Sequence, residues 1–139
     1  MSRKMLIRGI LLALWCAVIF SFSAQGGQQS QELSDGFLLF LPLFARFPLA
    51  GVLIRKFAHA LEYFVLAFFA FRFFEIFEKG DIPAFVFCFL YACSDELHQL
   101  FVGGRSAQFR DVLIDMGGVL LFWLIRRLFL YLFRRIRGN

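Results

Sequence analysis

The stretch Phe57-Ala-His-Ala-Leu-Glu-Tyr-Phe-Val-Leu-Ala-Phe-Phe-Ala-Phe-Arg-Phe-Phe74 decides the fold class of this chain. It is predominantly apolar, and its length approaches the roughly 20 residues that an α-helix needs to cross a bilayer. Short linkers at residues 75–81 and 103–111 connect it to two more apolar stretches, at residues 82–102 and 112–129. The pattern predicts a series of membrane-spanning helices.

A further apolar run, at residues 9–24, follows the basic start Met1 to Arg8 and completes a set of four candidate spans. It ends in small and polar residues, so the same pattern also describes a cleavable secretory signal peptide. Cleavage would leave the orientation of the later spans unchanged. At about 20 residues for each span, the chain has room only for termini and linkers besides, so we expect residues 1–139 to form a single membrane domain.

The composition supports this interpretation. Of the 139 residues, 60% are hydrophobic and 18% are charged, and the mean hydropathy is +0.73. A soluble domain is about 45–50% apolar and about 25% charged, and a domain of this length cannot hide so much apolar surface. An ordinary soluble enzyme is therefore excluded. The net charge of +5 comes from basic residues beside apolar segments, so it indicates membrane topology, and we expect no nucleic-acid partner.

The apolar run at residues 37–54 is also long, but Arg46 lies near its middle and Pro42 and Pro48 interrupt it. Proline removes a helix donor, and an arginine at mid-bilayer costs at least about 2.5–3.5 kcal/mol on insertion scales. We therefore expect this run to be an interfacial or re-entrant segment on one side of the membrane.

Basic residues decide the predicted topology, because Lys and Arg concentrate on the cytoplasmic side. With four spans and both ends in the cytoplasm, ten basic residues lie inside and five outside, whereas a fifth span would bury Arg46 and divide the others seven and seven. The sequence therefore predicts an all-α, multi-pass protein of the cytoplasmic membrane with four transmembrane helices and both termini cytoplasmic.

Polar and ionisable side chains gather at one predicted level, on the outer side. They are Lys56, His59, Glu62 and Tyr63 at the start of the second span, Asp95, Glu96, His98 and Gln99 at the end of the third, and Arg105, Arg110, Asp111 and Asp115 around the start of the fourth. Spacings of three and four residues place members of each group on a common helix face. Because ionisable groups within spans usually line a cavity or a substrate path, we expect three polar faces to converge on one outward-facing site.

These residue types allow acid/base chemistry and anion binding. The candidate catalytic residues are both histidines, which titrate near neutral pH, and the acids around them: His59, His98, Glu62, Asp95, Glu96 and Asp115. The candidate substrate-binding residues are Lys56, Tyr63, Gln99, Arg105, Arg110 and Asp111.

Other interpretations of the same residues, without catalysis or substrate binding, stay open. The charges nearly balance, which also suits a salt-bridge network that only locks the helices together. The histidines with Glu62 and Asp95 can ligate a divalent cation, but no complete motif such as His-Glu-x-x-His is present, so no metal or cofactor is assigned. The cysteines fall inside apolar runs and predict neither a disulfide framework nor a zinc site. They are Cys16, Cys88 and Cys93.

Three blocks of the chain resemble the VanZ-like family of small bacterial membrane proteins, as does the exit from the first span, Phe20-Ser-Phe-Ser-Ala-Gln25. The blocks are Arg55-Lys-Phe-Ala-His-Ala-Leu-Glu-Tyr63, Ser94-Asp-Glu-Leu-His-Gln-Leu-Phe101, and Gly104-Arg-Ser-Ala-Gln-Phe-Arg-Asp-Val-Leu-Ile-Asp115 with Gly117-Gly118. Gly103 stands where such proteins often have proline. The motif positions that carry over are Lys56, His59, Glu62, Tyr63, Asp95, Glu96, His98, Gln99, Arg105, Asp111 and Asp115.

The resemblance implies a role in the bacterial cell envelope, because the family takes its name from a member associated with resistance to the glycopeptide teicoplanin. One hypothesis is an enzyme that acts at the outer leaflet on an amphiphilic, phosphate-bearing or lipid-linked envelope precursor. A second is a protein that binds a lipid headgroup or the tail of a lipoglycopeptide without turnover. An ion or proton path ranks lowest, because comparable polar residues do not continue through the predicted spans. Near the cytoplasmic boundary of the spans they are limited to Arg72 and Glu75. Membrane lipids are the expected partners.

Overall fold

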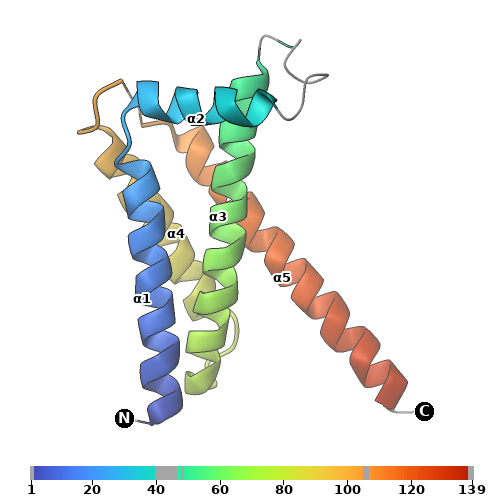
Figure 1. The fold of residues 1–139 in the computed structure, drawn as a ribbon. Coiled ribbons are helices and arrows are strands. Elements are labelled where there is room, and N and C mark those ends of the chain that lie inside the picture. The colour runs from blue at the N-terminus through green and yellow to red at the C-terminus, as the bar shows by residue number, and fades with distance from the viewer. Residues whose placement is uncertain (1, 40–46, 48, 105–106, 138–139) are drawn as a thin grey trace.

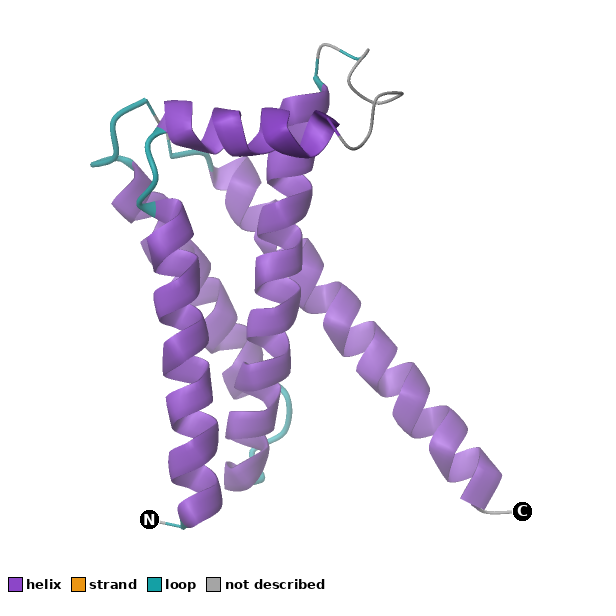
Figure 2. Cartoon of the chain, viewed as in Figure 1, coloured by secondary structure: helices purple, strands orange, loops and turns teal. Residues whose placement is uncertain are grey.

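The computed structural model describes residues 2–39, 47, 49–104 and 107–137, apart from the side chains of residues 30, 31, 35 and 37–39. This part of the chain is helical, with short connections and no strand (Figure 2). The elements are α1 (Arg3–Ser23), α2 (Gly27–Leu39), α3 (Ala50–Phe74), the short 3-10 helix η1 (Glu75–Phe77), α4 (Ile82–Gln99) and α5 (Phe109–Arg137). The predicted all-α fold is confirmed.

Helices α1, α3 and α4 run side by side, and α2 lies across one end of them, which we call the α2 end (Figure 1). Helix α5 starts at the α2 end, crosses α3 and then diverges from the bundle. Both chain termini lie at the opposite end, which we call the terminal end. The polar residues at the start of α3, the end of α4 and the start of α5 therefore meet at the α2 end.

The core between these helices is built from small and aliphatic side chains, so the helix axes can approach closely. Leu66, Ala67 and Ala70 of α3 are buried against Cys88 and Ala92 of α4. All cysteines of the chain are free thiols, as expected. Where α5 crosses α3, a Cβ added to Gly118 would come within 2.0 Å of the Ala60 carbonyl oxygen. Only glycine permits this crossing.

Two of the helices in the described part of the chain, α1 and α5, are long and apolar enough to cross a membrane. Only 11% of the most apolar stretch of each is buried inside the protein. The core helix of a soluble protein would be mostly buried, so the exposure of these two helices is more typical of helices that cross a membrane.

The helix bounds differ from the predicted spans. Helix α3 begins at Ala50 and so includes the last residues of the run at 37–54, while residues 40–46 and 48 of that run lie outside the described residues. Helix α4 ends at Gln99, and α5 continues to Arg137. Hydropathy predicts the part of a helix that lies inside a bilayer. The helix itself can continue into a polar segment, because its backbone hydrogen bonds persist wherever that segment contains no helix-breaking residue. Helix α2 was not predicted, because its polar sequence shows no strong apolar period.

A network of ion pairs joins the helices at the terminal end. Arg126 of α5 bonds to Asp81 at 3.1 Å and lies 3.5 Å from Glu75. The indole of Trp123 donates to Asp81 at 2.8 Å, and Arg8 of α1 donates to the Arg72 carbonyl at 2.6 Å. Every charge named here has a partner, which is the arrangement of a structural lock.

Candidate functional site

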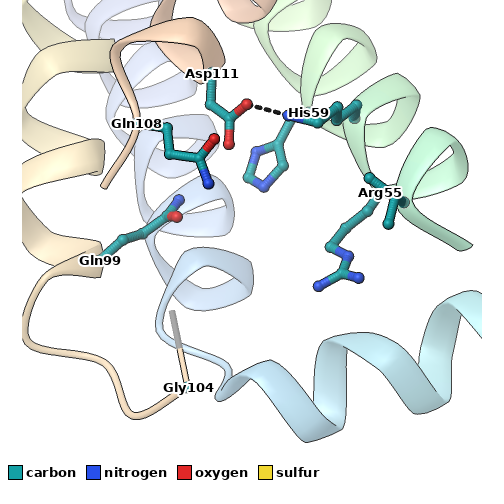
Figure 3. Close-up of a pocket in the computed structure, with 8 residues that line it drawn as sticks. Arg55, His59, Gln99, Gly104, Gln108 and Asp111 are labelled. Atoms are coloured by element: carbon teal, nitrogen blue, oxygen red, sulfur yellow. Dashed lines mark hydrogen bonds and ion pairs between the residues drawn. The ribbon is translucent and has the colours of Figure 1, made fainter. Parts of the chain in front are cut away.

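A cavity of about 210 Å³ opens at the α2 end between α3, the end of α4 and the start of α5 (Figure 3). Pockets that enclose a drug-sized ligand are about 300–1,000 Å³, so this cavity is smaller than those. Its lining consists of Val52, Arg55, Lys56, His59, Gln99, Gly104, Gln108 and Asp111. Only one of these side chains, that of Val52, is aliphatic.

Helix α3 supplies the charged face of the cavity. Lys56 forms an ion pair with Asp111 at the start of α5. One turn along, Nδ1 of His59 lies 3.4 Å from Oε2 of Glu62, and the His59 ring faces Gln99 and Gln108 across the cavity (Figure 3). An imidazole beside a carboxylate at this distance can act as a general acid or base.

Helix α4 supplies a buried hydrogen-bond network behind the lining. The Gln99 amide donates to Ser23 of α1 at 3.2 Å and to Asp95 at 3.3 Å. One residue after Asp95, the Glu96 carboxylate accepts from the backbone N–H of Gln108 at 2.8 Å. Both acids are almost fully buried. The network fixes the end of α4 against α1 and against the segment that enters α5.

Deeper in the bundle, Asp115 and Tyr63 are buried between α3, α4 and α5. Oδ1 of Asp115 and Oη of Tyr63 have no hydrogen-bond partner among the described residues. Asp95, Glu96, Asp111 and Glu62 all lie close enough to interact electrostatically with Asp115. A buried polar atom without a partner is rare in folded proteins and needs an explanation.

Three glycines meet beside the site. The N–H of Gly27, the first residue of α2, donates to the Gly103 carbonyl at 3.2 Å. A Cβ on Gly27 would come within 2.5 Å of the Gly104 carbonyl oxygen, and Gly104 has φ +77°, a conformation that favours glycine. The α1–α2 connection is thereby joined to the loop after α4.

The structure brings most of the predicted site residues together, in two layers. Lys56, His59, Gln99 and Asp111 line the cavity, and Glu62 holds His59 from behind. Asp95, Glu96, Asp115 and Tyr63 lie buried beneath, and none of them faces outward.

The remaining predicted residues are placed differently. The His98 ring packs against Phe20 of α1, with a centroid distance of 4.4 Å, and it does not line the cavity. Arg110 is exposed on the first turn of α5. Arg105 lies outside the described residues.

Three residues of the site were not assigned from the sequence: Arg55, Gln108 and Ser23. Arg55 precedes His59 by one helical turn, so the same periodicity that selected Lys56 and Tyr63 was the available signal. Gln108 and Ser23 contribute through tertiary contacts, for which helical spacing carries no signal.

Among the described residues, no group of three or more His, Cys, Asp or Glu side chains is arranged to hold a metal ion.

An all-helical bundle in which α1 and α5 expose apolar surface, with ionisable side chains gathered at one end, is typical of a membrane protein. Comparison with protein families agrees: the VanZ/LLP1 family model matches residues 9–130. The chain belongs to the VanZ/LLP1 family, as the motif blocks predicted. No curated protein and no solved structure matches it.

Proposed function

We propose that this protein spans the bacterial cytoplasmic membrane four times, through α1, α3, α4 and α5, with both termini in the cytoplasm. The common location of the termini at the terminal end supports an even number of spans (Figure 1). Arginines at that end, such as Arg8, Arg72, Arg126 and Arg127, suit the cytoplasmic side. The cavity then opens on the outer face.

We further propose that the cavity takes the polar headgroup of an amphiphilic envelope molecule. The observation that carries this proposal is a contrast between the two polar clusters. At the terminal end the charges named above are paired, whereas at the α2 end Arg55, Tyr63 and Asp115 each keep a buried polar atom without a partner in the described part of the chain. Imperfectly satisfied polar groups are typical of functional sites, where strain is retained for binding or chemistry.

The arrangement also supports a specific chemistry. His59, oriented by Glu62, would exchange a proton with the bound headgroup, and Lys56 with the amides of Gln99 and Gln108 would orient it. The alternative is a binding protein that uses the same contacts without turnover. An ion path is disfavoured, because the buried core between the two ends contains aliphatic residues such as Leu66, Ala67 and Ala70. Through this site, the protein would contribute to teicoplanin tolerance.

Incubation of the purified full-length protein with radiolabelled lipid extract from cell envelopes tests the proposal. A new labelled product, with turnover, identifies an enzyme, and stoichiometric retention of one lipid class identifies a binder. Lys79→Gln, at an exposed position near the terminal end, is the matched control and should behave as the wild type. If the protein neither converts nor retains any lipid, the cluster is a structural lock and the proposal is wrong.

A further inference from the structure

Arg55 is a cation of the cavity for which the described part of the chain provides no carboxylate partner. It lies on the second turn of α3, lines the cavity and points toward α2 (Figure 3). Its Nε is buried and has no hydrogen-bond partner among the described residues, and none of their carboxylates forms an ion pair with it. A half-buried arginine whose Nε donor has no partner in the described part of the chain is suited to an anion from outside the chain.

The charges around Arg55 leave the lining positive. Asp111 neutralises Lys56, and the other polar side chains of the lining, His59, Gln99 and Gln108, carry no full charge when the imidazole is neutral. Asp95 and Glu96 do not belong to the lining: they are buried behind it, where they accept hydrogen bonds from the Gln99 amide and from the backbone N–H of Gln108. The lining therefore has one net positive charge.

We infer that Arg55 binds the phosphate group of the ligand, and that the headgroup taken by this cavity is anionic. This inference rests on the proposed function and names the ligand class of the same site. A phosphate presents more acceptor oxygens than a carboxylate, and it can engage the guanidinium fork of Arg55 and the ammonium of Lys56 together, since both side chains line the cavity. A lipid phosphate is favoured over free phosphate, because Val52, which lines the cavity and is exposed, offers apolar surface to an acyl chain.

The test compares Arg55→Gln with Arg110→Gln. Both variants remove one arginine from the α2 end, but Arg110 is exposed and does not line the cavity, so Arg110→Gln is the matched control for net charge. Binding by the full chain in detergent is measured calorimetrically for dioctanoyl phosphatidic acid, with dioctanoylglycerol as its neutral counterpart. Decanoate supplies a carboxylate and inorganic phosphate supplies the free anion.

The wild type and Arg110→Gln should bind phosphatidic acid with similar affinity, and Arg55→Gln should bind it about 10–100-fold more weakly, the worth of a charge-assisted hydrogen bond. Thermal unfolding should show that Arg55→Gln is folded. Arg55→Lys, which keeps the positive charge, should recover part of the affinity that Arg55→Gln loses. An equal loss in both glutamine variants, or no loss in Arg55→Gln, would overturn the assignment of Arg55.

The probes separate the remaining outcomes. Equal binding of dioctanoylglycerol, or tighter binding of decanoate, overturns the phosphate inference and leaves the proposed headgroup site standing. Binding of inorganic phosphate with the affinity of phosphatidic acid overturns the choice of a lipid source. If no amphiphile binds the wild type, the inference and the proposed function both fail.

Discussion

The two histidines of the chain have different surroundings, although both belong to the motif blocks. His59 faces the cavity beside Lys56 and is held by Glu62. His98 packs against Phe20, with the two rings tilted, at the α1–α4 contact. The first environment suits proton transfer or binding, and the second suits packing. Substitution should therefore separate a functional histidine from a structural one.

We expect His59→Ala to keep near-normal protein levels and thermal stability but to abolish lipid binding or turnover, and with it teicoplanin tolerance in a susceptible host. His98→Ala should retain both activities and lose about 0.5–1.5 kcal/mol of stability, the value of an aromatic pair. Phe20→Ala is the control, since it removes the other half of that pair. Loss of tolerance in His98→Ala at unchanged stability would contradict this division of roles.

At the scale of the elements, the crossing of α3 and α5 positions the site. Asp111 and Asp115 lie within two turns before Gly118, the glycine that contacts the Ala60 backbone. Any side chain at position 118 pushes α5 away from α3 and moves both aspartates. Gly117 has open space around it, so the adjacent glycines differ in their tolerance of a methyl group.

Gly118→Ala should lower the stability of the folded protein by about 1–3 kcal/mol through overpacking, and it should also weaken headgroup binding. Gly117→Ala is the matched control and should be neutral, or more stable by up to about 1 kcal/mol, because alanine favours the helix. Thermal unfolding in detergent, followed by circular dichroism, measures both variants. Equal melting temperatures for the two would show that the close crossing does not hold α5.

At the scale of the whole molecule, the two ends differ in their polar chemistry. The α2 end combines most of the acids with the cavity, and the terminal end carries the basic termini and the paired network around Asp81. Between them, α1 and α5 present apolar surface. This distribution predicts which end faces the cytoplasm.

Cysteines introduced at Gln28 and Ala107 should react with a membrane-impermeant maleimide added outside intact cells, and a cysteine at Lys79 should react only after permeabilisation. Gln28 and Lys79 are both exposed in the fold, so membrane sidedness and not burial governs their labelling. The wild type, with its native Cys16, Cys88 and Cys93, provides the background. Labelling of Lys79 but not Gln28 from outside would invert the topology.

Periodicity was enough to predict much of the site. Lys56 and His59 on one helix, and Asp111 and Asp115 on another, follow from spacings of three and four residues, and the structure brings these helices together. The orientation of His98 was not predictable in this way. It lies one residue before Gln99, but its ring turns to Phe20 while Gln99 turns to Ser23 and Asp95. A spacing rule gives the face of a helix, and only the neighbouring helix decides which residue at its edge meets the site.

The sequence by itself determined the all-helical class, the family and the clustering of polar residues, because hydropathy, motif spacing and helical period are properties of the local chain. The tertiary structure alone decided that α2 lies across the polar end, that Gly27 packs on Gly104, and that Arg55 is left without a counter-ion in the described part of the chain. These features depend on contacts between segments far apart in sequence. Such contacts arise from the packing of whole helices, which no local pattern encodes.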